Sequence, residues 1–232
     1  NYPGVSLSLI VSDLFPGLKK GDVLSFWKLR SSLASTARLN TPYSTQSVFV
    51  NNFASGGGFS YGFTNANPDL KPEKQNTYEV GTEIRLFKNR LSIDGAYYNT
   101  VNKGQIIQTF RLSYATGFVL NTQNAGSSRN QGVELGIDIK AIRKKDLTWN
   151  IRFNFNKMKS EVLELPVAIA SEYYLADTWV YGNARGGLYR NQPTTTMTSY
   201  GYLRNNNGDV LINPTTGFPV TDPVFRVRGD RG

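Results

Sequence analysis

The chain has 232 residues and a net charge of +9, from 26 basic and 17 acidic residues, and it contains neither cysteine nor histidine. The two absences exclude disulfide bonds, thiolate chemistry and catalytic triads that depend on histidine. The basic residues are spread over short turns and polar strand positions rather than gathered in one arm or helix, so no nucleic-acid partner is expected.

The sequence contains no run of about 18 apolar residues that would cross a membrane as a helix. It opens on Asn1, and its last residues, RVRGDRG, follow the ending of neither a strand nor a helix. We therefore expect the chain to be a piece of a longer protein.

Six segments alternate apolar and polar residues with a period of two, which places the two kinds of side chain on opposite faces of a β-strand. In chain order they are residues 5–12, 23–37, 77–86, 91–100, 132–141 and 147–156. No helical periodicity of comparable length appears in the sequence. The pattern predicts an all-β fold.

The connections between these segments alternate in length. Short ones cover residues 14–22, 87–90 and 143–146, while long ones cover residues 39–76, 101–131 and everything after residue 161. In an antiparallel sheet the short turns then fall at one end and the long loops at the other, which is typical of an outer-membrane β-barrel. Alternating runs of about ten residues also suit a tilted membrane-crossing strand better than a globular strand of about 5–6 residues.

A barrel turns its apolar positions outward to lipid and its polar positions toward a wet lumen, because charges are costly in hydrocarbon. The segment LTWNIRFNFN, residues 147–156, shows the two sets clearly. The residues that we expect to face lipid are Trp149, Ile151, Phe153, Phe155, Val133, Leu135 and Ile137. The residues that we expect to face the lumen are Asp94, Glu134, Asp138 and Arg152.

A second interpretation stays open at this stage. The same strands could pack as a secreted or surface-exposed soluble β-sandwich, acting as a binding module or adhesin. That fold would bury Trp149, Ile151, Phe153 and Phe155 in a core, whereas a barrel would leave them outside.

Four blocks of the sequence resemble the SusC/RagA family of TonB-dependent outer-membrane transporters, in the family's order. The longest is NPDLKPEKQNTYEVGTEIRLFKNRLSIDGAYYNTVNKGQII, residues 67–107, with the NPDLKPE element of the wider receptor superfamily. The others are FWKLRSSLA with TPYST (residues 26–45), NAGSSRNQGVELGI (124–137) and WNIRFNFNKMKSEV (149–162). After residue 161 the resemblance thins, although GYLRNNNGDVLINPTTGFPV (201–220) still resembles part of the family's large external loop.

The resemblance implies a large barrel of the 22-stranded type with a plug, located in the outer membrane of a Gram-negative cell. It implies import of oligosaccharides or peptides with a SusD-like surface lipoprotein and with energy from TonB. Residues 1–162 would supply about six strands in three hairpins, and residues 163–232 a long extracellular loop region, with the plug and the C-terminal strands absent. A siderophore receptor of the same superfamily would differ in its substrate. The blocks at residues 124–137 and 149–162 favour the glycan or peptide importers instead.

No motif of the sequence indicates an enzyme, a cofactor or a metal site. SGGGFSYG (residues 55–62) lacks the lysine and helix of a phosphate-binding loop, and NNNGD (205–209) is better interpreted as a hairpin turn than as a calcium loop. We expect the lumenal carboxylates to form structural ion pairs with Arg85, Lys140 and Arg152. Loop aromatics that could stack on a substrate are Tyr173, Tyr174, Trp179 and Tyr181.

Overall fold

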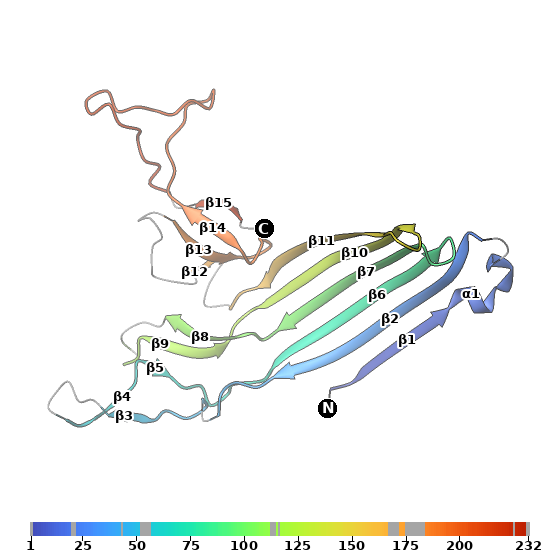
Figure 1. Ribbon diagram of the computed structural model, residues 1–232. Helices are drawn as coiled ribbons and strands as arrows, with labels where there is room; N and C mark the ends of the chain where they lie inside the picture. The colour runs from blue at the N-terminus through green and yellow to red at the C-terminus, as the bar shows by residue number, and fades with distance from the viewer. Residues whose placement is uncertain are drawn as a thin grey trace. The chain divides into compact units, whose positions relative to one another are not determined.

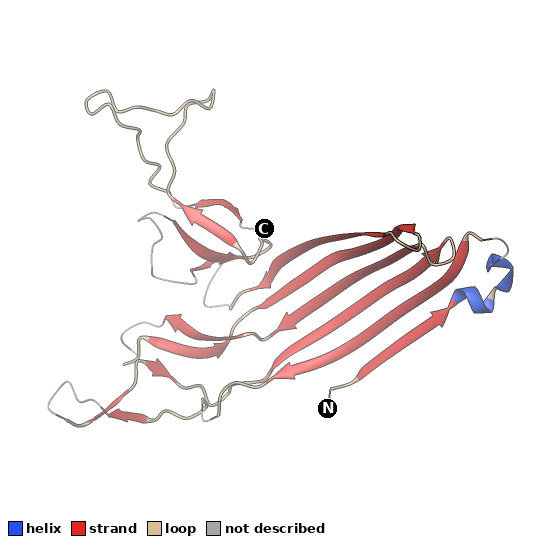
Figure 2. Cartoon of the chain, viewed as in Figure 1, coloured by secondary structure: helices blue, strands red, loops and turns tan. Residues whose placement is uncertain are grey.

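The computed structural model describes residues 2–19, 22–42, 44–51, 57–111, 115, 117–166, 172–174, 184–224 and 226–230. The chain divides into two compact units, Asn1–Lys159 and Ser160–Gly232. Apart from one α-helical turn and one 3₁₀ turn, the described part consists of strands, turns and loops, which confirms the all-β prediction (Figure 2). In the part of the chain that the structure describes, no helix is long and apolar enough to cross a membrane.

The first unit is dominated by a six-stranded sheet with the strand order β1-β2-β6-β7-β10-β11 (Figure 1). The pairs β1–β2, β2–β6, β6–β7 and β7–β10 are antiparallel. The strands are β1 (Gly4–Ile10), β2 (Leu24–Arg38), β6 (Glu73–Leu86), β7 (Leu91–Lys103), β10 (Ser127–Arg143) and β11 (Thr148–Glu164). Strands that are neighbours in the sheet are therefore successive long strands of the chain.

Each strand predicted from the sequence is present, but most extend further toward the long loops. β10 and β11 each have 17 residues. The extension of β10 consists of SSRNQ, residues 127–131, which is polar on both faces and so carries no period-two signal. These residues pair in register with β7, from Ser127 opposite Lys103 to Gln131 opposite Asn99. Backbone pairing continues the sheet there without any alternation of apolar and polar residues.

The connections at the turn end differ in structure. Between β1 and β2 lie α1 (Val11–Leu14) and the 3₁₀ helix η1 (Pro16–Lys19). The strand expected over residues 5–12 therefore ends at Ile10, and Val11 and Ser12 are buried in α1 instead. The β6–β7 turn is tight, with Phe87, Lys88 and Asn89 at φ values of 55°, 56° and 63°. Such left-handed backbone suits asparagine far better than phenylalanine or lysine, so residue preference alone does not predict this turn.

Smaller strands lie within the long loops. β3 (Phe49–Asn51) pairs with β4 (Phe59–Tyr61), while β5 (Thr64–Asn65) runs parallel to β9 (Leu120–Asn124), which is antiparallel to β8 (Ile106–Arg111). The second unit holds a sheet of four strands, β12 (Glu172–Tyr174), β13 (Ala184–Tyr189), β14 (Thr196–Ser199) and β15 (Arg226–Asp230). Its NNNGD segment forms the predicted hairpin turn, since Arg204 bridges to Val210 and Gly208 has a φ of 90°.

The described residues contain very little hydrophobic core. Their buried apolar side chains are Val11, Phe110, Ala125, Val162 and Leu165. None of these is among the seven residues named above as expected to face lipid. A sheet of this size with so little buried beneath it has to find a partner for its apolar side chains elsewhere.

Candidate functional site: the two faces of the sheet

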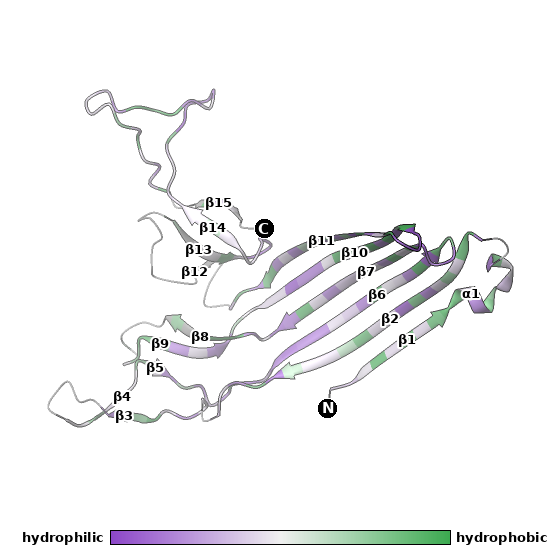
Figure 3. Cartoon of the chain, viewed as in Figure 1, coloured by the Kyte–Doolittle hydropathy of each residue, from purple (hydrophilic) through white to green (hydrophobic). Residues whose placement is uncertain are grey.

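One face of the six-stranded sheet is apolar across all its strands. The register places Val80 of β6 opposite Tyr97 of β7, and Tyr97 opposite Val133 of β10. Ile84, Ile93 and Ile137 form a second such row nearer the turns. Because directly paired residues share a face of the sheet, these rows belong to one continuous surface. Figure 3 shows the resulting alternation of hydrophobic and hydrophilic bands along the strands.

The side chains of this apolar face are open to the surroundings. On β11, Trp149 is 54% exposed, Phe153 52%, Phe155 46% and Ile151 38%. Val133 on β10 is exposed, while Leu135 and Ile137 are half-buried between their neighbours. A β-sandwich would bury these residues against a second sheet, so the sandwich interpretation is wrong for these strands.

This exposure carries an energetic consequence. Burying a side chain of this size away from water contributes about 1.5–3 kcal/mol, and the face repeats such residues on every strand. One polar pair on the face is satisfied internally, because Trp27 Nε1 donates to Thr82 Oγ1 at 3.1 Å, and Thr82 Oγ1 donates to the Lys28 carbonyl oxygen at 3.3 Å. The face therefore suits hydrocarbon better than water.

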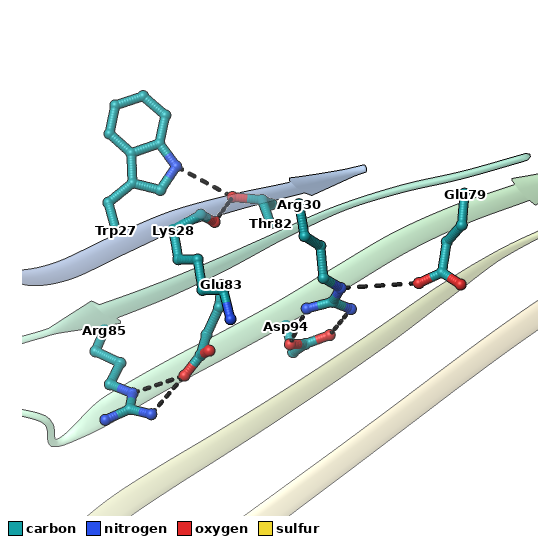
Figure 4. A network of polar contacts seen from close by, with 8 residues as sticks. All are labelled: Trp27, Lys28, Arg30, Glu79, Thr82, Glu83, Arg85 and Asp94. Atoms are coloured by element: carbon teal, nitrogen blue, oxygen red, sulfur yellow. Dashed lines mark hydrogen bonds and ion pairs between the residues drawn. The ribbon is translucent and has the colours of Figure 1, made fainter. Parts of the chain in front are cut away.

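The opposite face carries a network of ion pairs (Figure 4). Arg30 of β2 donates from Nη1 and Nη2 to the two carboxylate oxygens of Asp94, both at 2.8 Å. Its Nε also lies 3.8 Å from Glu79 Oε1. Two parallel hydrogen bonds between a guanidinium and a carboxylate fix both groups in orientation as well as in distance.

The path of Arg30 depends on a glycine. Arg30 lies on β2 and Asp94 on β7, so the side chain has to cross β6, and it does so at Gly81, its register partner. A Cβ atom on Gly81 would lie 2.6 Å from Arg30 Nε, closer than such contacts allow. Gly81 thus leaves the space in which an arginine joins two strands that are not neighbours.

A second glycine of this face, Gly132 on β10, also leaves space for a side chain of a neighbouring strand. Gly132 is the register partner of Tyr98, and the Tyr98 ring covers it so closely that a Cβ atom would lie 2.7 Å from the Tyr98 hydroxyl oxygen. An aromatic ring laid over a strand glycine covers the exposed backbone there.

The remaining predicted lumenal residues lie on this polar face. Asp94 is the register partner of Gly136, which places it in phase with Glu134 and Asp138. Arg152 of β11 donates from Nε to Asp138 Oδ1 at 2.6 Å, the ion pair expected from the sequence. Arg85 pairs with Glu83 at 2.6 Å instead of with a predicted carboxylate. Glu134 and Lys140 form no ion pair with any described residue.

Arg30 is the functional residue that sequence reasoning missed. Its partner is 64 residues away in the chain, so only the register brings the two together. The signal in the sequence was the isolated glycine of YEVGTEI, since a glycine inside a strand indicates a close approach by another group.

The aromatic residues of the loops are only partly placed. Tyr173 and Tyr174 lie in β12, opposite Leu188 and Gly187, whereas Trp179 and Tyr181 fall outside the described residues. A cluster that the sequence analysis did not single out lies in the β3–β4 hairpin. There Phe49 stacks on Tyr61 with centroids 4.7 Å apart, and Phe118 meets Tyr61 edge-on at 5.9 Å. The alternation of FSYGF, residues 59–63, was the available signal.

Neither face presents a recognisable reaction centre among the described residues. Asp94, Asp138 and Glu83 are each engaged by an arginine. Within the described ranges, no three acidic side chains come together in a group that could hold a metal ion. What the arrangement provides is a sheet with one apolar face and one face of ion pairs.

A single sheet of long strands, apolar on one face and ion-paired on the other, is typical of part of the wall of an outer-membrane β-barrel. The comparisons with known proteins agree. The chain belongs to the family described as TonB dependent receptor-like, beta-barrel, whose profile matches residues 13–228.

Relatives and solved structures confirm the resemblance to the SusC/RagA proteins. The chain is 30% identical over 154 residues to TonB-dependent receptor P3 of Formosa agariphila, covering 64% of the chain and 15% of that receptor. It is 31% identical over 112 residues to TonB-dependent receptor SusC of Bacteroides thetaiotaomicron, covering 47% of the chain and 11% of SusC. The structure of the RagAB peptide transporter shares the fold, with a TM-score of 0.74 and 24% identity over 95% of this chain and 24% of that one. The chain therefore spans only a small part of the length of the relatives that it matches.

Proposed function

We propose that these strands form part of the barrel of an outer-membrane active transporter that imports oligosaccharides or peptides. The transporter would take its energy from TonB and work with a SusD-like surface lipoprotein. Membership of the TonB-dependent receptor family supports the import function. The similarity to SusC and to the RagAB peptide transporter supports the choice of substrate class and of partner.

The observation that carries this proposal is the contrast between the two faces of one sheet. The apolar face, with Trp149, Phe153 and Phe155 about half exposed, would contact lipid. The face with Asp94, Glu134, Asp138 and Arg152 would line a wet lumen, where charged side chains stay hydrated. A closed barrel would place the apolar face against lipid and the charged face against water. It would also pair the backbone groups at both edges of the sheet.

A transport role also suits the state of the carboxylates better than catalysis does. Glycoside hydrolysis needs two carboxyl groups about 5–9.5 Å apart that are free to act as acid and as base or nucleophile. Asp94 and Asp138 instead accept hydrogen bonds from Arg30 and Arg152. Their role in this proposal is to hold strands together across the lumenal surface, and substrate recognition falls to the long loops.

The test is uptake by cells that produce the full-length protein. Fluorescently labelled neutral oligosaccharides and labelled short peptides are offered separately, with and without an uncoupler that collapses the proton gradient. We expect accumulation of one of the two classes, loss of that accumulation with the uncoupler, and loss when the SusD-like lipoprotein is removed from the cells. Uptake that is unchanged by the uncoupler, or uptake of neither class, would contradict the proposal.

A further inference from the structure

The two long loops of the first unit are joined by the side chain of Asn124. The first long loop, residues 39–72, links β2 to β6, and the second, residues 104–126, links β7 to β10. Asn124 Oδ1 accepts a hydrogen bond from the Lys71 backbone nitrogen at 2.7 Å. Asn124 Nδ2 donates to the carbonyl oxygen of Lys71 at 2.7 Å and to that of Gly104 at 2.8 Å, so both donor positions of the amide have an acceptor. One side chain therefore ties the first loop to both ends of the second.

The amide of Asn124 takes the place of a strand residue opposite Lys71. Two residues of an antiparallel pair exchange one N–H···O bond in each direction, and Asn124 offers Lys71 the same two bonds. Pro72 favours this contact, because the residue before a proline is restricted to extended backbone. Gly104 has a φ of 63°, a left-handed conformation that glycine adopts without strain. The contact thus depends on particular residues of sequence blocks that lie 53 positions apart.

A second contact between the same regions lies at the first residue of β6. Glu73 Oε1 accepts a hydrogen bond from the Ile106 backbone nitrogen at 2.7 Å, and a carboxylate is a stronger acceptor than a neutral group. Ile106 is held near Asn124, since residues 105 and 125–126 are joined by backbone hydrogen bonds of 2.6 and 3.3 Å. The group that these contacts form, which we call the loop clamp, consists of the side chains of Asn124 and Glu73 and the backbone groups of Lys71, Gly104 and Ile106.

Further contacts join the two loops beyond the loop clamp. β5 of the first loop runs parallel to β9 of the second, and Asn65 Nδ2 donates to Asn121 Oδ1 at 3.2 Å (Figure 1). Tyr61, which stacks on Phe49 in the first loop, is met edge-on by Phe118 of the second. The aromatic cluster is therefore assembled from both loops, and a movement of one loop against the other would take it apart.

We propose that the loop clamp holds the two long loops as one rigid unit, and that Asn124 and Glu73 act as positioning residues for recognition by these loops. This inference rests on the proposed function, because it assigns substrate recognition to the long loops. The clamp fixes the base on which Phe49, Tyr61 and Phe118 come together as one surface. Loops that are ordered before the substrate arrives lose less conformational freedom when they bind it, so the clamp strengthens binding.

The first measurement is amide hydrogen exchange, followed by mass spectrometry, on the full-length protein in dodecyl maltoside micelles. Asn124→Ala removes all three hydrogen bonds of the amide. Glu73→Ala removes the acceptor of the Ile106 N–H, whereas Glu73→Gln keeps a carbonyl oxygen for it. The matched control is Gln123→Ala, because Gln123 carries the neighbouring amide and its Nε2 is buried without a hydrogen-bond partner in the described part of the chain.

We expect Asn124→Ala to accelerate exchange in residues 63–71 and 117–124 by about fivefold or more, because loops that lose hydrogen bonds open more often. Glu73→Ala should act in the same direction, and Glu73→Gln should restore most of the protection. Exchange within the paired parts of β6 and β7 should stay unchanged in every variant. Unchanged loop exchange in Asn124→Ala, equal acceleration in loops and sheet, or the same effect from Gln123→Ala would each overturn the proposal.

Uptake by cells that produce equal amounts of each variant tests the positioning role. The probe is the labelled oligosaccharide or peptide that the unmodified protein accumulates, offered over a range of concentrations. We expect Asn124→Ala to raise the concentration for half-maximal uptake by about threefold or more and to leave the maximal rate within about twofold. Gln123→Ala should change neither. An unchanged half-maximal concentration together with faster loop exchange would contradict the positioning role. Failure of the proposed function is recognised separately, since the unmodified protein would then accumulate neither class of substrate.

Discussion

The apolar and polar faces of the six-stranded sheet are built from alternate residues of the same strands, yet they are stabilised in different ways. On the polar face, side chains stabilise one another through defined contacts such as the paired hydrogen bonds from Arg30 to Asp94. On the apolar face, Trp149 and Phe153 remain about half exposed among the described residues, so contacts within this part of the chain do not fix them. The polar face therefore depends on contacts between particular pairs of side chains. The apolar face depends on the medium that covers its side chains.

The largest effect is expected when a charge is placed in the middle of the apolar face. Leu135 lies opposite Gly95, well away from both ends of the strands. In the full-length protein folded into phosphatidylcholine vesicles, we expect Leu135→Arg to lower the free energy of unfolding by about 2–4 kcal/mol, because the guanidinium would enter hydrocarbon. Denaturant titration followed by tryptophan fluorescence measures the change.

The control for this substitution is the preceding residue in the chain, Glu134. Glu134 is exposed on the polar face, so Glu134→Arg makes a charge change where water is expected. We expect it to alter the free energy of unfolding by no more than about 0.5 kcal/mol. Equal costs for the two substitutions would mean that the two faces do not meet different solvents.

A smaller change in the free energy of unfolding is expected when Gly81 and Gly95 are each replaced by alanine. A Cβ atom on Gly81 would collide with Arg30 Nε at 2.6 Å, whereas one on Gly95 would meet Leu135 Cδ1 and Thr82 Cγ2 at an ordinary 3.9 Å. Gly81→Ala should therefore displace Arg30 and leave Asp94 unpaired, which lowers the free energy of unfolding by about 1–3 kcal/mol. Gly95→Ala should change it by no more than about 0.5 kcal/mol.

A double-mutant cycle shows whether the cost at Gly81 arises through Arg30. In a protein that already carries Arg30→Ala, the arginine no longer occupies the space above Gly81. Gly81→Ala should then be nearly neutral, so the two substitutions should not be additive. Additive costs would show that Gly81 is needed for a reason other than the passage of Arg30.

These positions also show how far the sequence alone leads. The period of two identifies both faces, because alternation along a strand is a local property that needs no partner. The pairing of Arg30 with Asp94 is not local: it depends on the register that sets Arg30 opposite Gly81 and Gly81 opposite Ala96.

Strand ends were predicted less well for a related reason. The first residues of β10, SSRNQ, are polar on both faces, so they lack the contrast from which a strand is recognised. Val11 and Ser12 show the opposite error, since they continue the alternation of β1 but fold into α1. Alternation of apolar and polar residues marks only the part of a strand whose two faces differ in polarity. Backbone hydrogen bonding between strands continues beyond that part.

The smallest effect concerns the two ion pairs of the polar face. Arg152 and Asp138 share one hydrogen bond of 2.6 Å, and their side chains are 71% and 51% exposed. Arg30 donates two hydrogen bonds to Asp94, and its side chain is 31% exposed. We expect Arg152→Gln to have the smallest effect on the free energy of unfolding, as is usual for an exposed pair, and that effect should vanish in high salt. The carboxylate partners are about equally exposed, Asp94 by 48% and Asp138 by 51%. Arg30→Gln should nevertheless cost more and should keep more of its cost in salt, because it removes two hydrogen bonds made by the less exposed arginine. Denaturant titrations of both variants at low and at high sodium chloride measure this difference. A larger cost for Arg152→Gln than for Arg30→Gln would mean that exposure does not rank the interactions on this face.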